Sequence, residues 1–153
     1  MALHIHKGLL QGFIQCMYDE GFVNDQFWQL QIMKNSRNQP DYVVRVVTSY
    51  CSSAQTLFSQ LTHHINQENV DFLQVKDIAR ELYDKSSSVG AEHVKLACAE
   101  LLVACEGHDK EYCSKGLYWT KNEFAHLRRK FETLVQCRWR GRSLILKVHL
   151  EGN

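Results

Sequence analysis

The sequence predicts an all-α fold, an antiparallel four-helix bundle with short additional helices at its N-terminal end. Residues that interrupt helices are scarce, with one proline and eight glycines among 153 residues. In four long segments, apolar residues recur at alternating steps of three and four, the spacing of helices that pack nearly parallel to one another. Short turns separate these segments. We therefore expect residues 1–137 to form a single domain.

Two short helices are expected before the bundle. The first spans residues 3–18, and Gly21 ends it. The second begins after Asn24, whose side chain suits an N-cap position. Its apolar residues are Phe27, Leu30 and Met33. Residues 35–39 form a polar turn that leads into the first long helix.

Two long helices follow. The third helix starts at Pro40, because proline fits the first turn of a helix, and runs to about Asn66. Its apolar positions are Val44, Val47, Cys51, Ala54, Phe58, Leu61 and Ile65. The fourth begins near Asn69 or Asp71. It has an inner stripe of Val75, Ile78, Ala79 and Leu82 and an outward side of Lys76, Arg80, Tyr83, Asp84 and Ser87. We expect the serines at 86–88 to end this helix and to cap the next one.

The fifth helix is predicted to end at Gly107, and the sixth to begin near Asp109. Their apolar positions are Val94, Ala97, Cys98, Leu101, Ala104 and Cys105, and then Leu117, Phe124, Leu127, Phe131 and Leu134. The pattern breaks down after Cys137. We expect residues 138–153 to form a divergent basic tail, disordered or with a short β-prone run at 144–148.

Charge is unevenly distributed along a chain whose net charge is +1, because residues 121–153 carry eight Lys and Arg residues against three Asp and Glu residues. A solvated helix end explains this excess better than a surface for nucleic acid or anionic lipid. The six cysteines lack the spacing of a zinc site and indicate buried thiols in a reducing compartment. No signal peptide or membrane-spanning segment is evident, so we expect an intracellular, soluble protein without metal or cofactor.

The segment from Ile78 to Ala91 reads Ile-Ala-Arg-Glu-Leu-Tyr-Asp-Lys-Ser-Ser-Ser-Val-Gly-Ala. It resembles the phosphorylation segment of plant histidine-containing phosphotransfer proteins, which runs His-Gln-Leu-Lys-Gly-Ser-Ser-Ser-Ser-Ile-Gly-Ala. Residues 25–31, 40–43 and 94–98 resemble further blocks of that family in the same order. The resemblance extends from about residue 10 to about residue 136 and implies the same four-helix bundle.

Aligned on residues 86–91, the family's histidine corresponds to Arg80, its lysine to Tyr83, its glycine to Asp84 and its first serine to Lys85. In the family, the exposed histidine accepts the phosphoryl group through a neutral ring nitrogen. An arginine stays protonated and cannot act as that nucleophile. The chain therefore resembles the pseudo-phosphotransfer proteins, and we expect no catalytic residue and no enzymatic activity.

The resemblance implies an adaptor that docks on receiver domains of hybrid sensor histidine kinases and response regulators, and that inhibits a cytokinin-type multistep phosphorelay. The expected docking residues are Phe27, Trp28, Gln31, Lys76, Arg80, Tyr83, Asp84 and Ser87. We expect a monomer in the cytoplasm and nucleus that binds neither nucleic acid nor membrane. The alternative is a helical scaffold that has lost receiver docking and binds another protein. A transferase that uses another histidine, such as His93, is the weakest hypothesis.

Overall fold

The computed structural model describes the backbone of residues 2–30 and 42–151, and the side chains of residues 8–30 and 42–137. Its helices are α1 (Ala2–Asp19), α3 (Tyr42–Ile65), α4 (Phe72–Val89), α5 (Glu92–Glu106) and α6 (Lys110–Glu151). Residues 25–30 form a further helical segment. No strand occurs in the described part of the chain, apart from one isolated bridge between Val23 and Ala91. The predicted all-α fold is confirmed.

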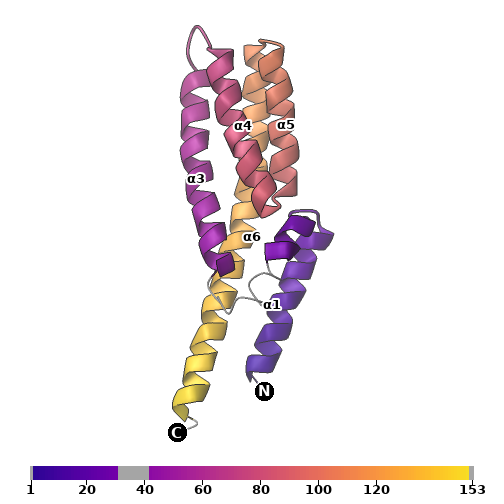
Figure 1. Ribbon diagram of the computed structural model, residues 1–153, viewed down its shortest axis with the longest axis vertical. Helices are drawn as coiled ribbons and strands as arrows, with labels where there is room; N and C mark the ends of the chain where they lie inside the picture. The colour runs from indigo at the N-terminus through magenta and orange to yellow at the C-terminus, as the bar shows by residue number, and fades with distance from the viewer. Residues whose placement is uncertain (1, 31–41, 152–153) are drawn as a thin grey trace.

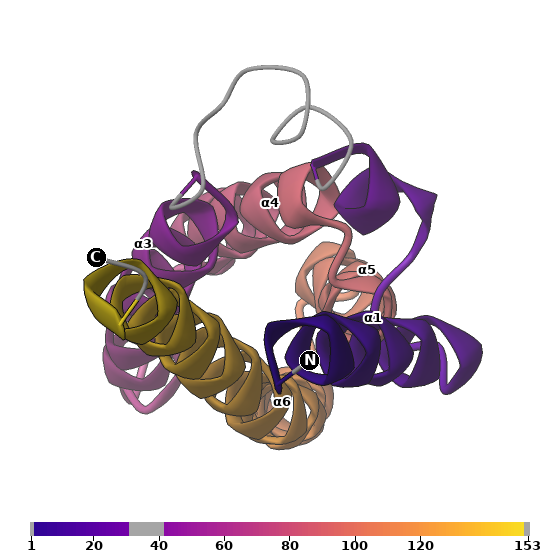
Figure 2. The same ribbon diagram turned by 90° about the horizontal axis from the view of Figure 1, so that it is seen from below.

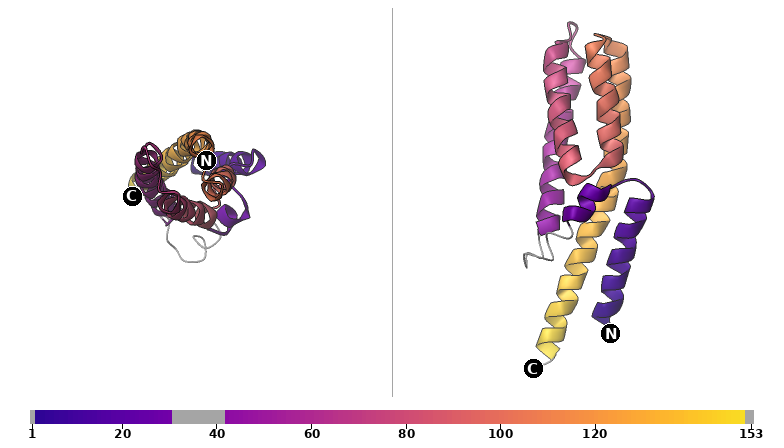
Figure 3. Two further views of the ribbon diagram at one scale, coloured as in Figure 1. Left: turned by 90° about the horizontal axis from the view of Figure 1, so that it is seen from above. Right: turned by 45° about the vertical axis from the view of Figure 1, so that its right-hand side comes forward.

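Helices α3 to α6 form an antiparallel four-helix bundle in which each helix contacts both of its neighbours (Figure 1). Helix α6 extends well beyond the other three, and α1 lies antiparallel along this extension. Figure 2 shows the bundle end-on, with α1 outside the ring and next to α6. Segment 25–30 lies below the turn that joins α4 to α5 (Figure 3).

The core lies along the bundle axis and continues toward α1 and segment 25–30. The predicted inner stripe of α4 is buried as expected. In α3, the buried stripe includes Val43 and Tyr50 in place of the predicted Val44 and Cys51, which are half-buried. The apolar pattern alone could not distinguish these neighbours, because α3 has apolar residues at adjacent positions on both sides of its seam.

Gly90 ends α4 in the left-handed conformation, with φ 78° and ψ 27°. A Cβ atom at this position would lie 2.6 Å from the Asn24 Oδ1 atom and 2.6 Å from the backbone nitrogen of Phe27. The Asn24 N–H donates to the Gly90 carbonyl at 3.0 Å. The Asn24 side chain donates to Glu92 at 2.6 Å and accepts from the Gln26 N–H at 2.9 Å. Asn24 is therefore the predicted N-cap and also connects segment 25–30 to the α4–α5 turn.

The three serines near the end of α4 differ from their predicted role. They lie within the helix, where Ser87 and Ser88 donate to the carbonyls of Tyr83 and Lys85 at 2.9 Å each. Ser86 is fully buried and shares a hydrogen bond with the Tyr50 hydroxyl at 2.8 Å. The expectation that they cap the next helix is wrong, because α5 begins after Ala91 without a side-chain cap.

Helix α6 also continues beyond its predicted end. The backbone of residues 138–151 belongs to the same helix, so the expected disordered or β-prone tail is not observed. The segment contains one glycine and no proline, and its Arg, Leu, Lys and Trp residues are compatible with a helix. That residues 1–137 form a domain by themselves stays a prediction.

None of the described helices combines the length and the apolar character that crossing a membrane requires. Nor do the described residues include a cluster of three or more His, Cys, Asp or Glu side chains placed to hold a metal ion.

Replacing a core residue should destabilise the bundle far more than replacing Arg80. Phe58 and Leu127 are 6% and 1% exposed. We therefore expect Phe58→Ala or Leu127→Ala to lower the free energy of unfolding by about 2–5 kcal/mol through lost burial and cavity formation. Arg80→Ala, at an exposed position, should change it by less than about 0.5 kcal/mol. Urea titrations followed by circular dichroism measure these differences, and similar losses for both classes would contradict the assigned faces.

Substituting Gly90 should be costly. Gly90→Ala should destabilise the protein by about 1–2 kcal/mol from the left-handed backbone alone, with a further loss from the contact with Phe27. Hydrogen exchange of residues 24–30 should also become faster. Gly12→Ala is the matched control. A Cβ at Gly12 meets no atom within 4 Å, so this change should leave stability unchanged or raise it by up to about 1 kcal/mol. Equal effects of both substitutions would contradict the role of Gly90.

Candidate functional site

The candidate site is the outer flank of α4, formed by Lys76, Arg80, Tyr83, Asp84 and Ser87. Lys76, Arg80, Tyr83 and Ser87 follow one another at steps of four, three and four, so they form one stripe along the helix. Asp84 lies beside this stripe, one turn after Arg80. All five were predicted to point outward, and none of them is fully buried.

The five residues differ in how firmly they are held. The Lys76 ammonium lies 3.5 Å from the Glu106 carboxylate, which anchors it to the end of α5. The Tyr83 ring packs against the edge of the core, and its carbonyl accepts the Ser87 hydroxyl. Arg80 and Asp84 are exposed, and within the described part of the chain no ion pair joins either of them to another residue. The flank therefore presents one guanidinium and one carboxylate to solvent between anchored neighbours.

Segment 25–30 contributes less to the surface than predicted. Phe27 is 0% exposed and stacks on Phe131 of α6, with ring centroids 5.8 Å apart. The prediction that Phe27 contacts a partner is wrong, because its ring points into the core and is not accessible to solvent. Trp28 is half-buried and lies edge-on to Tyr18 at 5.9 Å, so part of its ring stays accessible. Gln31, the third predicted residue here, lies outside the described residues.

The Gly90 turn brings the two parts of the predicted surface together. Because the Asn24 N–H binds the Gly90 carbonyl, segment 25–30 lies at the end of α4 that carries Ser87. The same Asn24 side chain, by donating to the Glu92 carboxylate, holds the pKa of that carboxyl below its ordinary value. Arg80 lies nearly three helical turns away from this junction, near the middle of α4.

The outer flank contains no group that could accept a phosphoryl group at neutral pH as a histidine does. Helix α4 has no histidine. His93, at the start of α5, lies with its Nδ1 atom 3.5 Å from the Glu123 carboxylate and its ring 5.3 Å from that of Phe22, on the side facing α6. Burial raises the pKa of the Cys98 and Cys105 thiols to about 12 each, so these sulfurs remain protonated.

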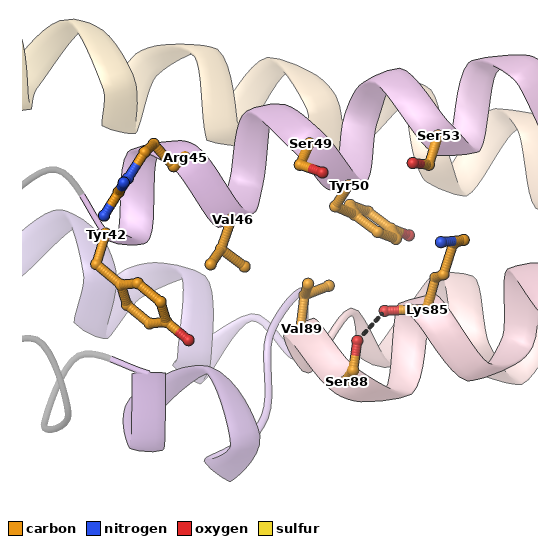
Figure 4. A pocket seen from close by; sticks show the side chains of 9 residues that line it. All are labelled: Tyr42, Arg45, Val46, Ser49, Tyr50, Ser53, Lys85, Ser88 and Val89. Atoms are coloured by element: carbon orange, nitrogen blue, oxygen red, sulfur yellow. Dashed lines mark hydrogen bonds between the residues drawn. The ribbon is translucent and has the colours of Figure 1, made fainter.

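One residue near the site, Glu106, was not singled out from the sequence. It anchors Lys76 from the neighbouring helix, and only the antiparallel arrangement of α4 and α5 brings the two together. Lys85, which the resemblance aligns with the family's first serine, lies on the opposite flank of α4, facing α3, where it lines a cleft (Figure 4). No pattern within one helix indicated this cleft.

Comparisons with known proteins agree with this geometry. The chain is 34% identical over 136 residues to histidine-containing phosphotransfer protein 1 of Oryza sativa subsp. japonica, covering 89% of this chain and 92% of the relative. It is 34% identical over 127 residues to histidine-containing phosphotransfer protein 1 of Arabidopsis thaliana, covering 83% and 82%. Pseudo histidine-containing phosphotransfer protein 2 of rice is 27% identical over 120 residues, covering 78% and 79%. No protein-family model matches the chain.

Solved structures lead to the same family. A histidine-containing phosphotransfer protein from maize superimposes with a TM-score of 0.85 at 32% identity, covering 88% of this chain and 98% of that one. The corresponding protein from Medicago truncatula gives a TM-score of 0.85 at 26% identity, covering 91% and 94%. From the bundle, the order of its helices and this similarity along most of the sequence, we conclude that the chain belongs to the plant histidine-containing phosphotransfer proteins.

Proposed function

We propose that this chain is a non-catalytic phosphotransfer-like adaptor that docks on receiver domains through the outer flank of α4 and inhibits a cytokinin-type phosphorelay by competition. The observation that carries the proposal is that Arg80 is exposed on the outer flank of α4. By the resemblance, its position corresponds to the phosphoryl-accepting histidine of the family. The bundle beneath it is complete, so the surface retains its shape while its chemistry has changed.

The chemistry of phosphoryl transfer is missing at three neighbouring positions. A guanidinium stays protonated at neutral pH and cannot attack a phosphoryl group. Tyr83 stands where the family has a lysine and supplies no cation to the phosphate. Asp84 stands where the family has a glycine, and its exposed carboxylate repels an incoming phosphoryl group. Two of the rice relatives are themselves named pseudo histidine-containing phosphotransfer proteins.

Docking is supported by the accessibility of Arg80. By the resemblance, the partner is a receiver domain, whose active site is a cluster of aspartates. A free guanidinium can form charge-assisted hydrogen bonds with those carboxylates. The i, i+4 spacing of Arg80 and Asp84 suits an ion pair, but the described residues include no such pair. Asp84 therefore opposes docking in two ways: its carboxylate repels the receiver carboxylates, and its removal from water costs free energy. We expect a weak complex with a dissociation constant in roughly the micromolar range.

The second candidate function is a scaffold that has lost receiver docking and binds another protein. Four changed positions favour it: Arg80, Tyr83, Asp84 and Lys85 all differ from the family segment. The burial of Phe27 removes one further predicted contact. Titration against receiver domains separates the two functions.

We further propose that the chain is a monomer and acts in the cytoplasm and nucleus.

The chain should not accept a phosphoryl group. Incubated with a receiver domain that carries labelled phosphate, it should gain no acid-labile label above that of a protein without histidine, because position 80 offers no nucleophile. A histidine-containing phosphotransfer protein that is active in the same assay is the positive control. Label on this chain that is lost in acid and that persists in an Arg80→Ala variant would show that another histidine is used.

Restoring the histidine alone should give little activity. Arg80→His leaves Asp84 one turn away and no lysine at position 83, so transfer should stay far below that of the triple variant Arg80→His, Tyr83→Lys, Asp84→Gly. Labelling rates of the two variants, compared at equal folded concentration, measure this difference. If the single substitution restores the full rate, the residues at 83 and 84 do not matter for transfer.

Receiver binding should depend on the charges of the outer flank. Arg80→Glu should weaken binding by about tenfold or more, because it places a carboxylate against the acidic site of the receiver. Asp84→Asn should strengthen binding, since it removes a like charge without shortening the side chain. Calorimetric titrations against a panel of receiver domains at low Mg²⁺ measure both effects. Arg129→Glu, an equivalent charge change at an exposed position of α6, should leave affinity unchanged. If neither α4 substitution alters binding, or if no receiver binds, the scaffold function is favoured.

A further inference from the structure

A cleft separates α3 from α4 on the flank opposite Arg80. Its volume is about 570 Å³, within the range of small-molecule binding sites. The cleft is lined by Tyr42, Arg45, Val46, Ser49, Tyr50, Ser53, Lys85, Ser88 and Val89 (Figure 4). No function described above uses it.

The lining is positively charged. It contains a lysine and an arginine and no aspartate or glutamate. Figure 4 shows the Lys85 ammonium and the Tyr50 hydroxyl at the same end of the cleft, next to Ser53. Lys85 is half-buried and makes no ion pair with any described residue, so its charge is available to a ligand. Ser49 and Ser53 have hydroxyls without a hydrogen-bond partner among the described residues.

Tyr50 gives a second, independent indication of a ligand. Its side chain lines the cleft although the residue is only 4% exposed, and its hydroxyl bonds to the fully buried Ser86. Two hydroxyl groups carry two hydrogens, and this single bond uses one of them. The second has no acceptor among the described residues. When Ser86 donates to Tyr50, the hydrogen without an acceptor is that of the Tyr50 hydroxyl, and an oxygen atom in the cleft would satisfy this buried donor. Burial also raises the pKa of Tyr50, so the hydroxyl keeps its hydrogen at neutral pH.

The remainder of the cleft is apolar. Val46 from α3 and Val89 from α4 face the opening between its two ends, and the Tyr42 ring lies at the end away from Lys85 (Figure 4). A flat or branched hydrocarbon body would cover these side chains. Its length could span the cleft from the ammonium to the tyrosine ring.

We propose that this cleft binds a small organic anion. Its carboxylate or phosphate group accepts hydrogen bonds from Lys85, Ser53 and the Tyr50 hydroxyl, and its apolar body rests on Val46 and Val89. The open shape of the cleft limits the affinity to the high micromolar or millimolar range. Because the site faces α3, it is separate from the outer flank of α4, and its occupancy does not depend on receiver docking.

Titration of the full-length protein by amide NMR tests the proposal, with phenyl phosphate and phenylacetate as the two anionic probes. Each should produce saturable shifts at Ser49, Ser53, Lys85 and Ser88 by about 10 mM. Comparing the two shows which oxyanion group is preferred. Benzyl alcohol, which has the ring without the charge, should bind at least about tenfold more weakly. Inorganic phosphate, which has the charge without the ring, should also bind more weakly than phenyl phosphate.

Two variants test the residues. Lys85→Gln should weaken phenyl phosphate binding by about tenfold or more, and Tyr50→Phe by a smaller factor, because it removes the hydroxyl and keeps the ring. Lys115→Gln is the matched control: it removes an equal charge from an exposed position of α6, outside the cleft and outside the outer flank of α4, and should leave binding unchanged. Circular dichroism of each variant verifies that it is folded.

Three results would overturn the proposal. The first is shifts that do not saturate or that spread over the surface of the protein. The second is equal binding of benzyl alcohol and phenyl phosphate, which would exclude an oxyanion site. The third is an affinity that Lys85→Gln and Lys115→Gln reduce equally, which would indicate a general effect of net charge.

Discussion

The structure depends on a close approach of two backbones at Gly90. With only 2.6 Å between the place of a Cβ atom and the Phe27 nitrogen, the end of α4 and the start of segment 25–30 meet only if position 90 is glycine. Three connections follow from this approach: Asn24 caps the segment, its amide group binds Glu92 of α5, and Phe27 reaches Phe131 of α6. One turn thus joins four elements: segment 25–30, α4, which carries the candidate site, α5 and α6.

The two faces of α4 differ in what they contribute to stability. Its inward residues, among them Ala79, Leu82 and Ser86, are fully buried and maintain the bundle. Ser86 is a polar residue in the core, and its hydroxyl forms a hydrogen bond with that of Tyr50 on α3. The outward residues make few contacts, so substitutions at positions such as Arg80 should cost little folding energy. The chemistry of the outer flank can therefore vary without a change of fold.

The sequence predicted the features that depend on local periodicity. The four long helices, the inner stripe of α4 and the N-cap role of Asn24 follow from spacing and from the hydrogen-bonding ability of single residues. Phe27 was misassigned although it shares the apolar side of its helix with Leu30, because its docking role was inferred from the resemblance and not from this pattern; both side chains are buried. The extension of α6 was missed because its apolar pattern ends where the bundle ends, although α1 runs alongside α6 there. The cleft at Lys85 requires two helices in register, which no pattern within one helix can reveal.

The charges of α4 favour selectivity over tight binding. Between Lys76 and Lys85 the helix carries three positive and three negative side chains, so the segment has no net charge. Glu106 compensates Lys76 and Lys85 lines the cleft toward α3, so Arg80 is exposed beside three carboxylates, those of Asp77, Glu81 and Asp84. A partner that presents only carboxylates gains at Arg80 and loses at Asp84, whereas a partner with a cation or a hydrogen-bond donor opposite Asp84 gains at both. The partner should therefore combine an acidic site with a basic or amide group one helical turn away, about 6 Å along the axis. Unlike a uniformly basic surface, such a surface of mixed charge discriminates among otherwise similar acidic partners.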